Sequence, residues 1–417
     1  MNIRTIVRSR QGAVRILALC VSLTSTALLS GCADFWKPVT TTTTTTTGSG
    51  TNLVYVGKNA SSQLAGYAIG AGSLTAVSGS PYSLSSPATA LSINPKNTFL
   101  YIGTASGIYG YSIATGGALT ALSSGAALAS GYPVASMDVS PDGNWIAVLS
   151  NTLTQGIYVY PLNTSTGLFS TGSETTLVPG NGVPVTGSCS PVAQSIKFSP
   201  LESQQATTVV AATFGCGGVA TYTFNNSTTS GGVPAYVAYL APTAATISYN
   251  GLAWTTNGTS LFVASGGTDN EILPFTVDTT GGTITAATPA QAVGTNPTAI
   301  SFSKSQSYLY VTNAGNLTTP GSTVSGYAVS ISSGTPTFTA LANAPYATNG
   351  NSPSAIGYDN SGAYMLVLNQ TGPPDLLQYT VDTTSGTAGR LYVTASVSTG
   401  LSALTTAVGG TVLVTTH

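Results

Sequence analysis

Residues 137–150 read MDVSPDGNWIAVLS, and this stretch decides the fold. It begins with a few residues of alternating polarity, passes through Ser140-Pro141-Asp142-Gly143, and ends in an uncharged apolar run. Proline fixes one backbone angle of a tight turn, and glycine supplies the positive φ that such turns need. The stretch therefore predicts two short antiparallel strands joined by a turn.

The same unit recurs along the chain, with comparable turns at residues 94–97 and 359–362. The strand that follows in each unit is built around one aromatic residue, and this column contains Tyr67, Tyr111, Tyr160, Tyr222, Phe275, Tyr327 and Tyr379. Short β-branched and aromatic strands repeated at long period are typical of propeller blades. We therefore expect an all-β, seven-bladed β-propeller of four-stranded antiparallel blades over residues 52–417. A β-sandwich is the alternative, but sandwiches lack this long period.

The last strand of each unit is expected to be the inner strand of the next blade. One column of large apolar residues supports this alignment, and it reads Leu91, Met137, Ile196, Leu252, Ile300, Ile356 and Leu404. On this alignment the C-terminal strand Ser402–Thr406 closes the ring. Residues Val412–Thr416 resemble a further strand, which competes with Leu53–Val56 for one place.

The N-terminus has the pattern of a lipoprotein signal peptide, expected over residues 1–31. Several arginines precede an apolar stretch at residues 16–29, which is too short to span a bilayer. Leu29-Ser30-Gly31-Cys32 then resembles a bacterial lipobox, so we expect cleavage before Cys32 and its lipidation. An ordinary secretory signal is the alternative. Residues 32–51, with the run Thr40–Thr47, read as a linker, and the lipid predicts attachment to the membrane in the cell envelope, at the outer membrane.

Charge is scarce, with 10 Lys+Arg and 11 Asp+Glu, or 5% of the chain. The chain has no cluster of basic residues outside its N-terminus, which argues against nucleic acid as a partner. The only histidine is the last residue, His417, where a side chain is expected to fray. The sequence therefore offers no positioned histidine base for a Ser-His-Asp triad and too few His or Cys ligands for a zinc site. We therefore assign no catalytic residue, metal or cofactor, and expect a monomer.

Five residues are candidates for ligand binding. Asp138 and Lys197 occupy the same column in consecutive inner strands, so we expect them to form an ion pair near the axis. The pair acts either as a clasp between two blades or as a polar anchor for a ligand. Tyr82, Tyr132 and Tyr346 lie in loops that lead to inner strands, where they either line a glycan or peptide site or pack between blades.

Cys189 and Cys216 are expected to form a disulfide. Cys189 lies in the loop entering an inner strand, and Cys216 lies between the second and third strands of the same blade. Antiparallel order places both loops on one face of the propeller, and an oxidising envelope would let the thiols pair. Two separate buried thiols are the alternative.

Several segments resemble the lactonase family of seven-bladed propellers, which includes a 6-phosphogluconolactonase type. They are LVYVGKNASSQLAGYAI at 53–69, GSLTAVSGSPY at 72–82, MDVSPDGNWIAVLS at 137–150 and FTVDTTGGTITA at 275–286. The resemblance implies the propeller fold and, in enzyme-like members, histidines before inner strands and an Arg-His stretch. The matching places in this chain read Tyr132-Pro133-Val134-Ala135 and Asn296-Pro297-Thr298-Ala299.

Because neither place carries His or Arg, the sequence favours a non-catalytic envelope protein that binds a glycan, peptide or protein. A lactone hydrolase with an unusual site is the alternative. A shared fold by itself decides neither, because one fold hosts many functions.

Overall fold

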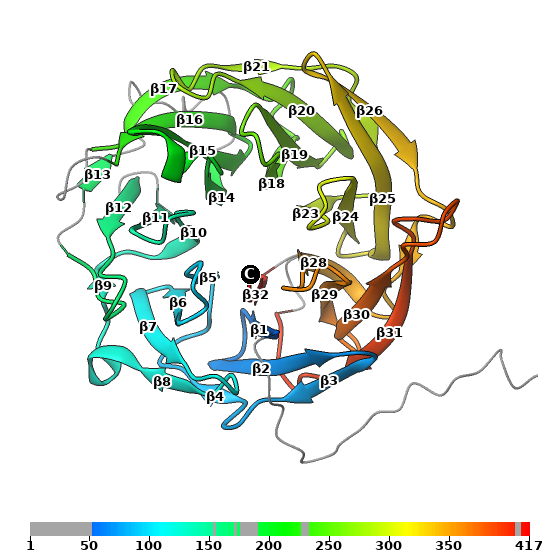
Figure 1. Cartoon of the computed structure of the whole chain (residues 1–417). Coiled ribbons are helices and arrows are strands. Elements are labelled where there is room, and N and C mark those ends of the chain that lie inside the picture. Colours follow the sequence, from blue (N-terminus) through cyan, green and yellow to red (C-terminus); the bar gives the residue numbers. More distant parts are fainter. Residues whose placement is uncertain (1–51, 153–155, 171–172, 176–190, 227–232, 405–409) are drawn as a thin grey trace, which may run out of the picture. The chain divides into compact units, whose positions relative to one another are not determined.

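The strands form a ring of seven four-stranded antiparallel blades in the described residues (Figure 1). This computed structural model describes residues 52–152, 156–170, 173–175, 191–226, 233–404 and 410–417. Residues 1–43 and 44–417 are separate units, and the described residues all belong to the second.

Each blade begins with an inner strand at the axis and ends with an outer strand. In that order, blade 1 contains β32 (Thr411–Thr415), β1 (Leu53–Lys58), β2 (Gln63–Gly70) and β3 (Ser73–Ala76). Blade 2 contains β5 (Ala90–Ile93), β6 (Phe99–Thr104), β7 (Gly107–Ile113) and β8 (Leu119–Ala121). Blade 3 contains β10 (Val134–Val139), β11 (Trp145–Ser150), β12 (Ile157–Pro161) and β13 (Ser173–Thr175). Blade 4 contains β14 (Val192–Phe198), β15 (Thr207–Gly215), β16 (Gly218–Asn225) and β17 (Ala235–Leu240).

The remaining blades follow the same order. Blade 5 contains β18 (Ser248–Trp254), β19 (Ser260–Gly266), β20 (Glu271–Val277) and β21 (Ile284–Ala286). Blade 6 contains β23 (Pro297–Phe302), β24 (Tyr308–Gly315), β25 (Pro320–Ser332) and β26 (Thr335–Ala340). Blade 7 contains β28 (Asn351–Tyr358), β29 (Tyr364–Thr371), β30 (Leu376–Val381) and β31 (Leu391–Val397). In four blades, a two-residue strand also pairs with the third strand. These pairs are β4 (Tyr82–Ser83) with β2, β9 (Ala129–Ser130) with β7, β22 (Gln291–Ala292) with β20 and β27 (Tyr346–Ala347) with β25. Two 3-10 turns, η1 (Leu122–Gly125) and η2 (Glu202–Gln204), lie between strands.

The tight turns between inner and second strands form as the sequence predicts. Gly143 has a φ of 77°, and the equivalent Asn97 and Gly362 have φ values of 57° and 74°. In blade 3, Ser140 Oγ accepts a hydrogen bond from the backbone N–H of Trp145 at 3.0 Å. This side chain therefore closes the turn and fixes where β11 begins.

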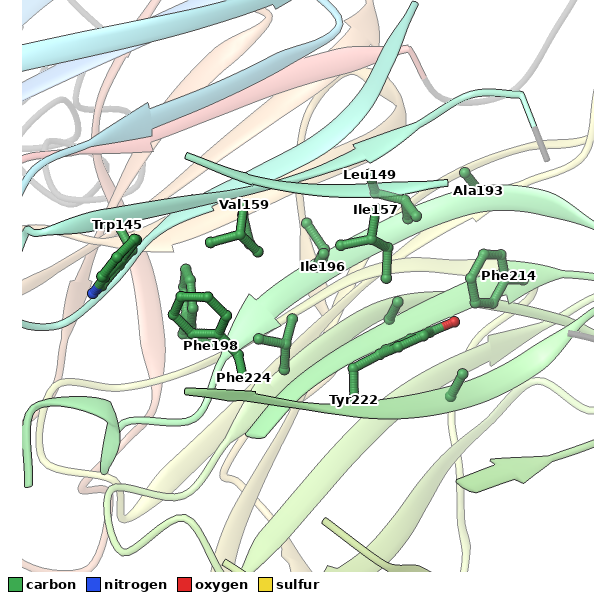
Figure 2. Packing of buried hydrophobic residues seen from close by; sticks show 14 residues of the cluster. Trp145, Leu149, Ile157, Val159, Ala193, Ile196, Phe198, Phe214, Tyr222 and Phe224 are labelled. Carbon is green, nitrogen blue, oxygen red and sulfur yellow. The ribbon is translucent and has the colours of Figure 1, made fainter. Parts of the chain in front are cut away.

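Consecutive blades pack face to face through apolar side chains. Between blades 3 and 4, buried residues of both sheets form one cluster, and the labelled ones are Trp145, Leu149, Ile157, Val159, Ala193, Ile196, Phe198, Phe214, Tyr222 and Phe224 (Figure 2). The rings of Trp145 and Phe224 meet edge to face with centroids 5.0 Å apart. Such burial is the main stabilising term of the ring, and it holds neighbouring inner strands at fixed positions.

The ring closes with a different strand from the one expected from the sequence. β32 pairs antiparallel with β1, with Val56 opposite Leu413 and Val54 opposite Thr415. Residues 402–404 form no strand, and the rest of the expected strand lies outside the described residues. The expectation that Ser402–Thr406 is the seventh inner strand is therefore wrong. Leu413, and not Leu404, takes the place equivalent to Leu91, because β1 pairs with it as β6 pairs with Leu91.

Candidate active site

The inner strands of all seven blades surround a central cavity of about 630 Å³. They contribute mainly the first half of each strand, together with loop residues such as Asn59, Asn151 and Asn296. The polar lining consists of carboxamides and hydroxyls, and Lys197 is the one charged side chain among the lining residues that the structure describes. The cavity therefore offers many neutral hydrogen-bonding groups and a single cation.

Much of this polar lining ties one blade to the next. Thr89 Oγ1 donates to the carbonyl oxygen of Val134 at 2.6 Å. At equivalent places in later blades, Asn250 Nδ2 donates to the carbonyl of Pro297 at 2.6 Å, and Thr298 Oγ1 donates to that of Pro353 at 3.0 Å. Because these donors are engaged by the backbone of the following blade, they stabilise the ring and are less available to a ligand.

The predicted Asp138–Lys197 ion pair is confirmed. Lys197 Nζ lies 3.1 Å from Asp138 Oδ1, and the backbone N–H of Phe198 donates to Asp138 Oδ2 at 2.9 Å. The Lys197 side chain is 47% exposed and that of Asp138 is 17% exposed. The neighbouring carboxylate raises the pKa of the Lys197 ammonium, so this side chain stays cationic at neutral pH.

Blades 3 and 4 supply the polar lining side chains that make no hydrogen bond to the described part of the chain. They are Gln194 and Ser195 on β14, and Asn151, the residue that follows β11. These groups and the Lys197 ammonium are the polar side chains left to a ligand on this side of the cavity. Asn151, Gln194 and Ser195 were not among the candidates chosen from the sequence, although the latter two precede Lys197 on the same strand.

The three candidate tyrosines pack between strands and do not line the cavity. The Tyr132 ring stacks on Tyr158 with centroids 4.3 Å apart, and its hydroxyl lies 2.8 Å from that of Tyr160. The hydroxyls of Tyr82 and Tyr346 donate to backbone carbonyls four residues earlier in the chain. Their positions agree with the packing interpretation, because each ring belongs to or packs against an apolar cluster of buried residues.

His417 is ordered, contrary to the expectation that it frays. Its backbone N–H donates to Asn97 Oδ1 at 2.9 Å, its carbonyl accepts from Asn97 Nδ2 at 3.1 Å, and its Nε2 lies 3.3 Å from the carbonyl oxygen of Ile93. The reason is that β32 is an inner strand, so the chain ends near the middle of the ring (Figure 1). Burial lowers the pKa of this imidazole, which keeps it neutral at pH 7.

Two predicted sites lie outside the described residues. Cys32 and Cys189 both fall there, so lipidation and the disulfide stay predictions. Cys216 is described, in the turn between β15 and β16 with a φ of 58°. Within the described ranges, no helix is long and apolar enough to cross a membrane. No three His, Cys, Asp or Glu side chains gather as a metal site in those same ranges.

The chain belongs to the lactonase family of seven-bladed β-propellers, whose model matches residues 44–404. No curated protein matches the sequence. Among solved structures, a periplasmic gluconolactonase of Pseudomonas aeruginosa is 17% identical, with a TM-score of 0.62 over 88% of this chain and 99% of that chain. A Lactobacillus plantarum protein is 18% identical, with a TM-score of 0.64 over the same shares. A Bacteroides uniformis protein, described as a candidate 6-phosphogluconolactonase, is 15% identical with a TM-score of 0.63, again over 88% and 99%. At these identities the likenesses show the fold.

The preference for a non-catalytic binding module is corrected by the family match. That preference depended on the missing His and Arg before the inner strands. Their absence does not leave the cavity without functional groups, because polar side chains reach it from other positions, namely Lys197 and the carboxamides around it. The findings favour the alternative, a lactone hydrolase.

Proposed function

We propose that this protein is a lactone hydrolase whose active site is the central cavity. The observation that carries the proposal is the match of the lactonase family model to residues 44–404, nearly the whole described ring. The cavity supports it, because its carboxamides and hydroxyls suit a polyhydroxylated ring, and Lys197, the one cation among its described lining residues, suits an oxygen that becomes negative.

The overall reaction consumes only the lactone and one water molecule. The oxygen of water bonds to the lactone carbonyl carbon, and the carbonyl π electrons move to the carbonyl oxygen. When the C=O bond forms again, the bond between that carbon and the ring oxygen breaks. The ring oxygen takes up the proton that the attacking water gives up, and becomes a hydroxyl. The new carboxylic acid then ionises, so each turnover releases one proton near neutral pH.

This proton gives the test. The purified chain is mixed with lactones of sugar acids and with simple γ- and δ-lactones, and proton release is followed with a pH indicator. We expect release above the rate in buffer for at least one lactone, in proportion to protein concentration. Rates equal to buffer for every lactone would overturn the proposal.

We also propose that the protein is anchored in the cell envelope through a lipid on Cys32. The lipobox-like Leu29-Ser30-Gly31-Cys32 and the preceding apolar stretch support this placement. A lipid anchor would put the cavity in a compartment where extracellular lactones arrive.

A further inference from the structure

We infer that Lys197, positioned by Asp138, is the catalytic residue that binds the reacting carbonyl oxygen, and that the substrate is an uncharged lactone. This inference rests on the proposed function and goes further by naming the reacting group and the charge of the substrate. It follows from how charge is distributed around the cavity.

Lys197 has donors to spare. An ammonium carries three N–H donors, and the described contacts of Lys197 Nζ use one of them, toward Asp138 Oδ1 at 3.1 Å. The side chain lines the cavity and is 47% exposed. Two N–H groups are therefore available to an oxygen atom inside the cavity.

Asp138 holds that ammonium in place. Its Oδ2 accepts the backbone N–H of Phe198, the residue next to Lys197 on β14, while its Oδ1 accepts from Lys197. Each oxygen of one carboxylate is thus committed to the same short segment of β14. This arrangement fixes the direction of the Lys197 side chain before a substrate arrives, which is how a preorganised donor lowers a barrier.

The same pair limits the charge of the substrate. A phosphate monoester carries about −1.5 to −2 charges at pH 7 and is usually held by several cationic or backbone donors. Among the described lining residues this cavity has one ammonium, and the Asp138 carboxylate already balances its charge. The neutral carboxamides of Asn151 and Gln194 match the hydroxyls of a sugar lactone instead.

Lys197 acts on the charge that appears during the reaction. The carbonyl oxygen is neutral in the lactone and negative in the tetrahedral intermediate, so the ammonium binds the intermediate more strongly than the substrate. Removing one such donor typically lowers kcat by about 10²–10³-fold. The loss should appear in kcat, with KM changed little.

The experiment measures kcat and KM on D-glucono-1,5-lactone and on its 6-phosphate, for the wild type, Lys197→Met, Lys197→Arg, Asp138→Asn and Lys304→Met. Lys304 is the matched control, because it donates to the backbone carbonyl of Asn360 and does not line the cavity. We expect the wild type to prefer the uncharged lactone. Lys197→Met should lose about 10²-fold in kcat, Lys197→Arg should recover part of it, and Lys304→Met should match the wild type.

The variant Asp138→Asn tests whether Asp138 positions the Lys197 ammonium or only stabilises the fold. Removing the carboxylate takes away the group that raises the pKa of Lys197. The alkaline decline of kcat should therefore move to lower pH, an effect that a purely structural role would not produce. Thermal melting checks that each variant is folded. If Lys197→Met does not fold, Lys197→Gln replaces it in the comparison.

Two results would overturn the inference, and two others separate its failure from that of the substrate class or the proposed function. Wild-type kcat in both folded Lys197→Met and Lys197→Gln would remove Lys197 from the reaction. Preference of the wild type for the 6-phosphate would refute the uncharged substrate. If the wild type hydrolyses neither of these two lactones but does hydrolyse a simple lactone, and Lys197→Met still lowers that rate, the sugar lactone is refuted as the substrate and the role of Lys197 stands. No hydrolysis of any lactone would refute the proposed function itself.

Discussion

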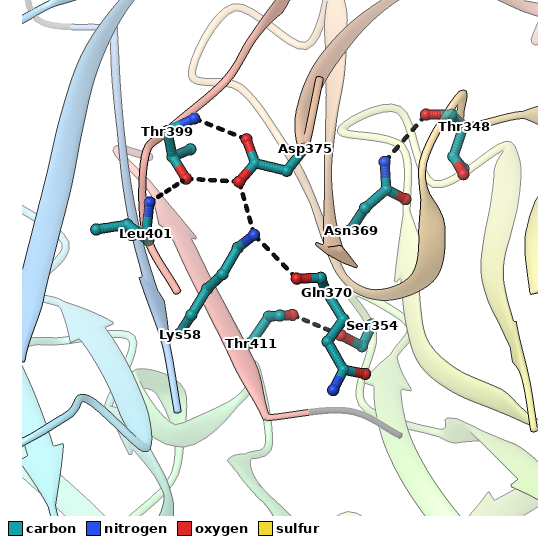
Figure 3. A network of polar contacts seen from close by, with 9 residues as sticks. All are labelled: Lys58, Thr348, Ser354, Asn369, Gln370, Asp375, Thr399, Leu401 and Thr411. Carbon is teal, nitrogen blue, oxygen red and sulfur yellow. Dashed lines mark hydrogen bonds and ion pairs between the residues drawn. The ribbon is translucent and has the colours of Figure 1, made fainter. Parts of the chain in front are cut away.

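Lys58 Nζ lies 2.6 Å from Asp375 Oδ2, and this ion pair joins the first blade to the last (Figure 3). Both side chains are almost fully buried, at 2% and 3% exposure. Asp375 also accepts hydrogen bonds from the backbone N–H and the hydroxyl of Thr399, and Lys58 Nζ donates to the carbonyl oxygen of Gln370 at 3.0 Å. The ring is therefore fastened by a hydrogen-bonded buried pair as well as by the pairing of β32 with β1.

Breaking this pair should destabilise the ring strongly. Removing one partner leaves a buried charge without compensation, which costs about 3–5 kcal/mol. We expect Lys58→Met and Asp375→Asn each to lower the free energy of unfolding by roughly that amount in urea titrations. Lys197→Met is the control, since its half-exposed pair should contribute only about 0.2–1 kcal/mol. Equal losses in both pairs would contradict the burial argument.

Glu202 should make stability depend on pH. The residue follows β14 in η2 and is fully buried, with Oε1 accepting from Asn226 Nδ2 at 2.8 Å. Burial, assisted by the nearby Asp142, raises the pKa of the Glu202 carboxyl to about 7. The unfolded chain releases this proton near a pH of about 4.3, so the folded state holds more protons between these values. Stability should therefore fall as pH rises through this window and level off above it.

The size of this fall is roughly 3–4 kcal/mol, because a difference of one in pKa between the folded and unfolded states corresponds to about 1.36 kcal/mol. Glu202→Gln should flatten the dependence between about pH 5 and 7 and be more stable than the wild type at about pH 8. Thermal melting across this pH range measures it. Glu271→Gln, at a partly exposed position on β20, is the control for replacing a glutamate by glutamine. A Glu202→Gln curve parallel to the wild type would show that Glu202 titrates normally.

Lipidation can be tested by fractionation. Cys32→Ser should release the protein from membranes, because the thiol at residue 32 is expected to accept the lipid. Cys20→Ser is the matched control, since residue 20 lies in the predicted signal peptide, and it should remain with the membrane fraction. Retention of Cys32→Ser in that fraction would refute the lipoprotein interpretation.

The disulfide prediction concerns Cys189 and Cys216. Alkylation of the unfolded, non-reduced mature protein should modify neither thiol, and both should react after reduction. Closing this loop is expected to stabilise the fold by roughly 3 kcal/mol by the chain-entropy model. Two alkylated cysteines without reduction would show that the thiols do not pair.

The fold could be predicted because its signals are local and repeated. Turns such as Ser140-Pro141-Asp142-Gly143 and the aromatic column specify strands, and the shared register of inner strands placed Asp138 beside Lys197. The prediction of the strand that closes the ring was wrong because the signals are local. Ser402–Thr406 and Val412–Thr416 both fit the strand pattern, and only pairing with β1 distinguishes them.

The site was less accessible from sequence. Tyr82 was a candidate because aromatic residues in loops often bind ligands, yet its hydroxyl is engaged by the backbone. Gln194 and Ser195 were missed because ordinary polar residues carry no motif. Side chains at equivalent places in other blades, such as Thr298, make hydrogen bonds to the next blade, whereas Gln194 and Ser195 make none. This difference can be seen only in the structure.

The central claim is that the cavity hydrolyses a lactone, and one paired measurement tests it most directly. Initial rates of D-glucono-1,5-lactone hydrolysis are compared for the wild type and Asn151→Trp, which fills the cavity from an exposed lining position. Thr285→Trp, on the exposed outer strand β21, is the matched control. We expect hydrolysis above the buffer rate in the wild type and Thr285→Trp, and its loss in folded Asn151→Trp. Equal rates in all three proteins would contradict the claim.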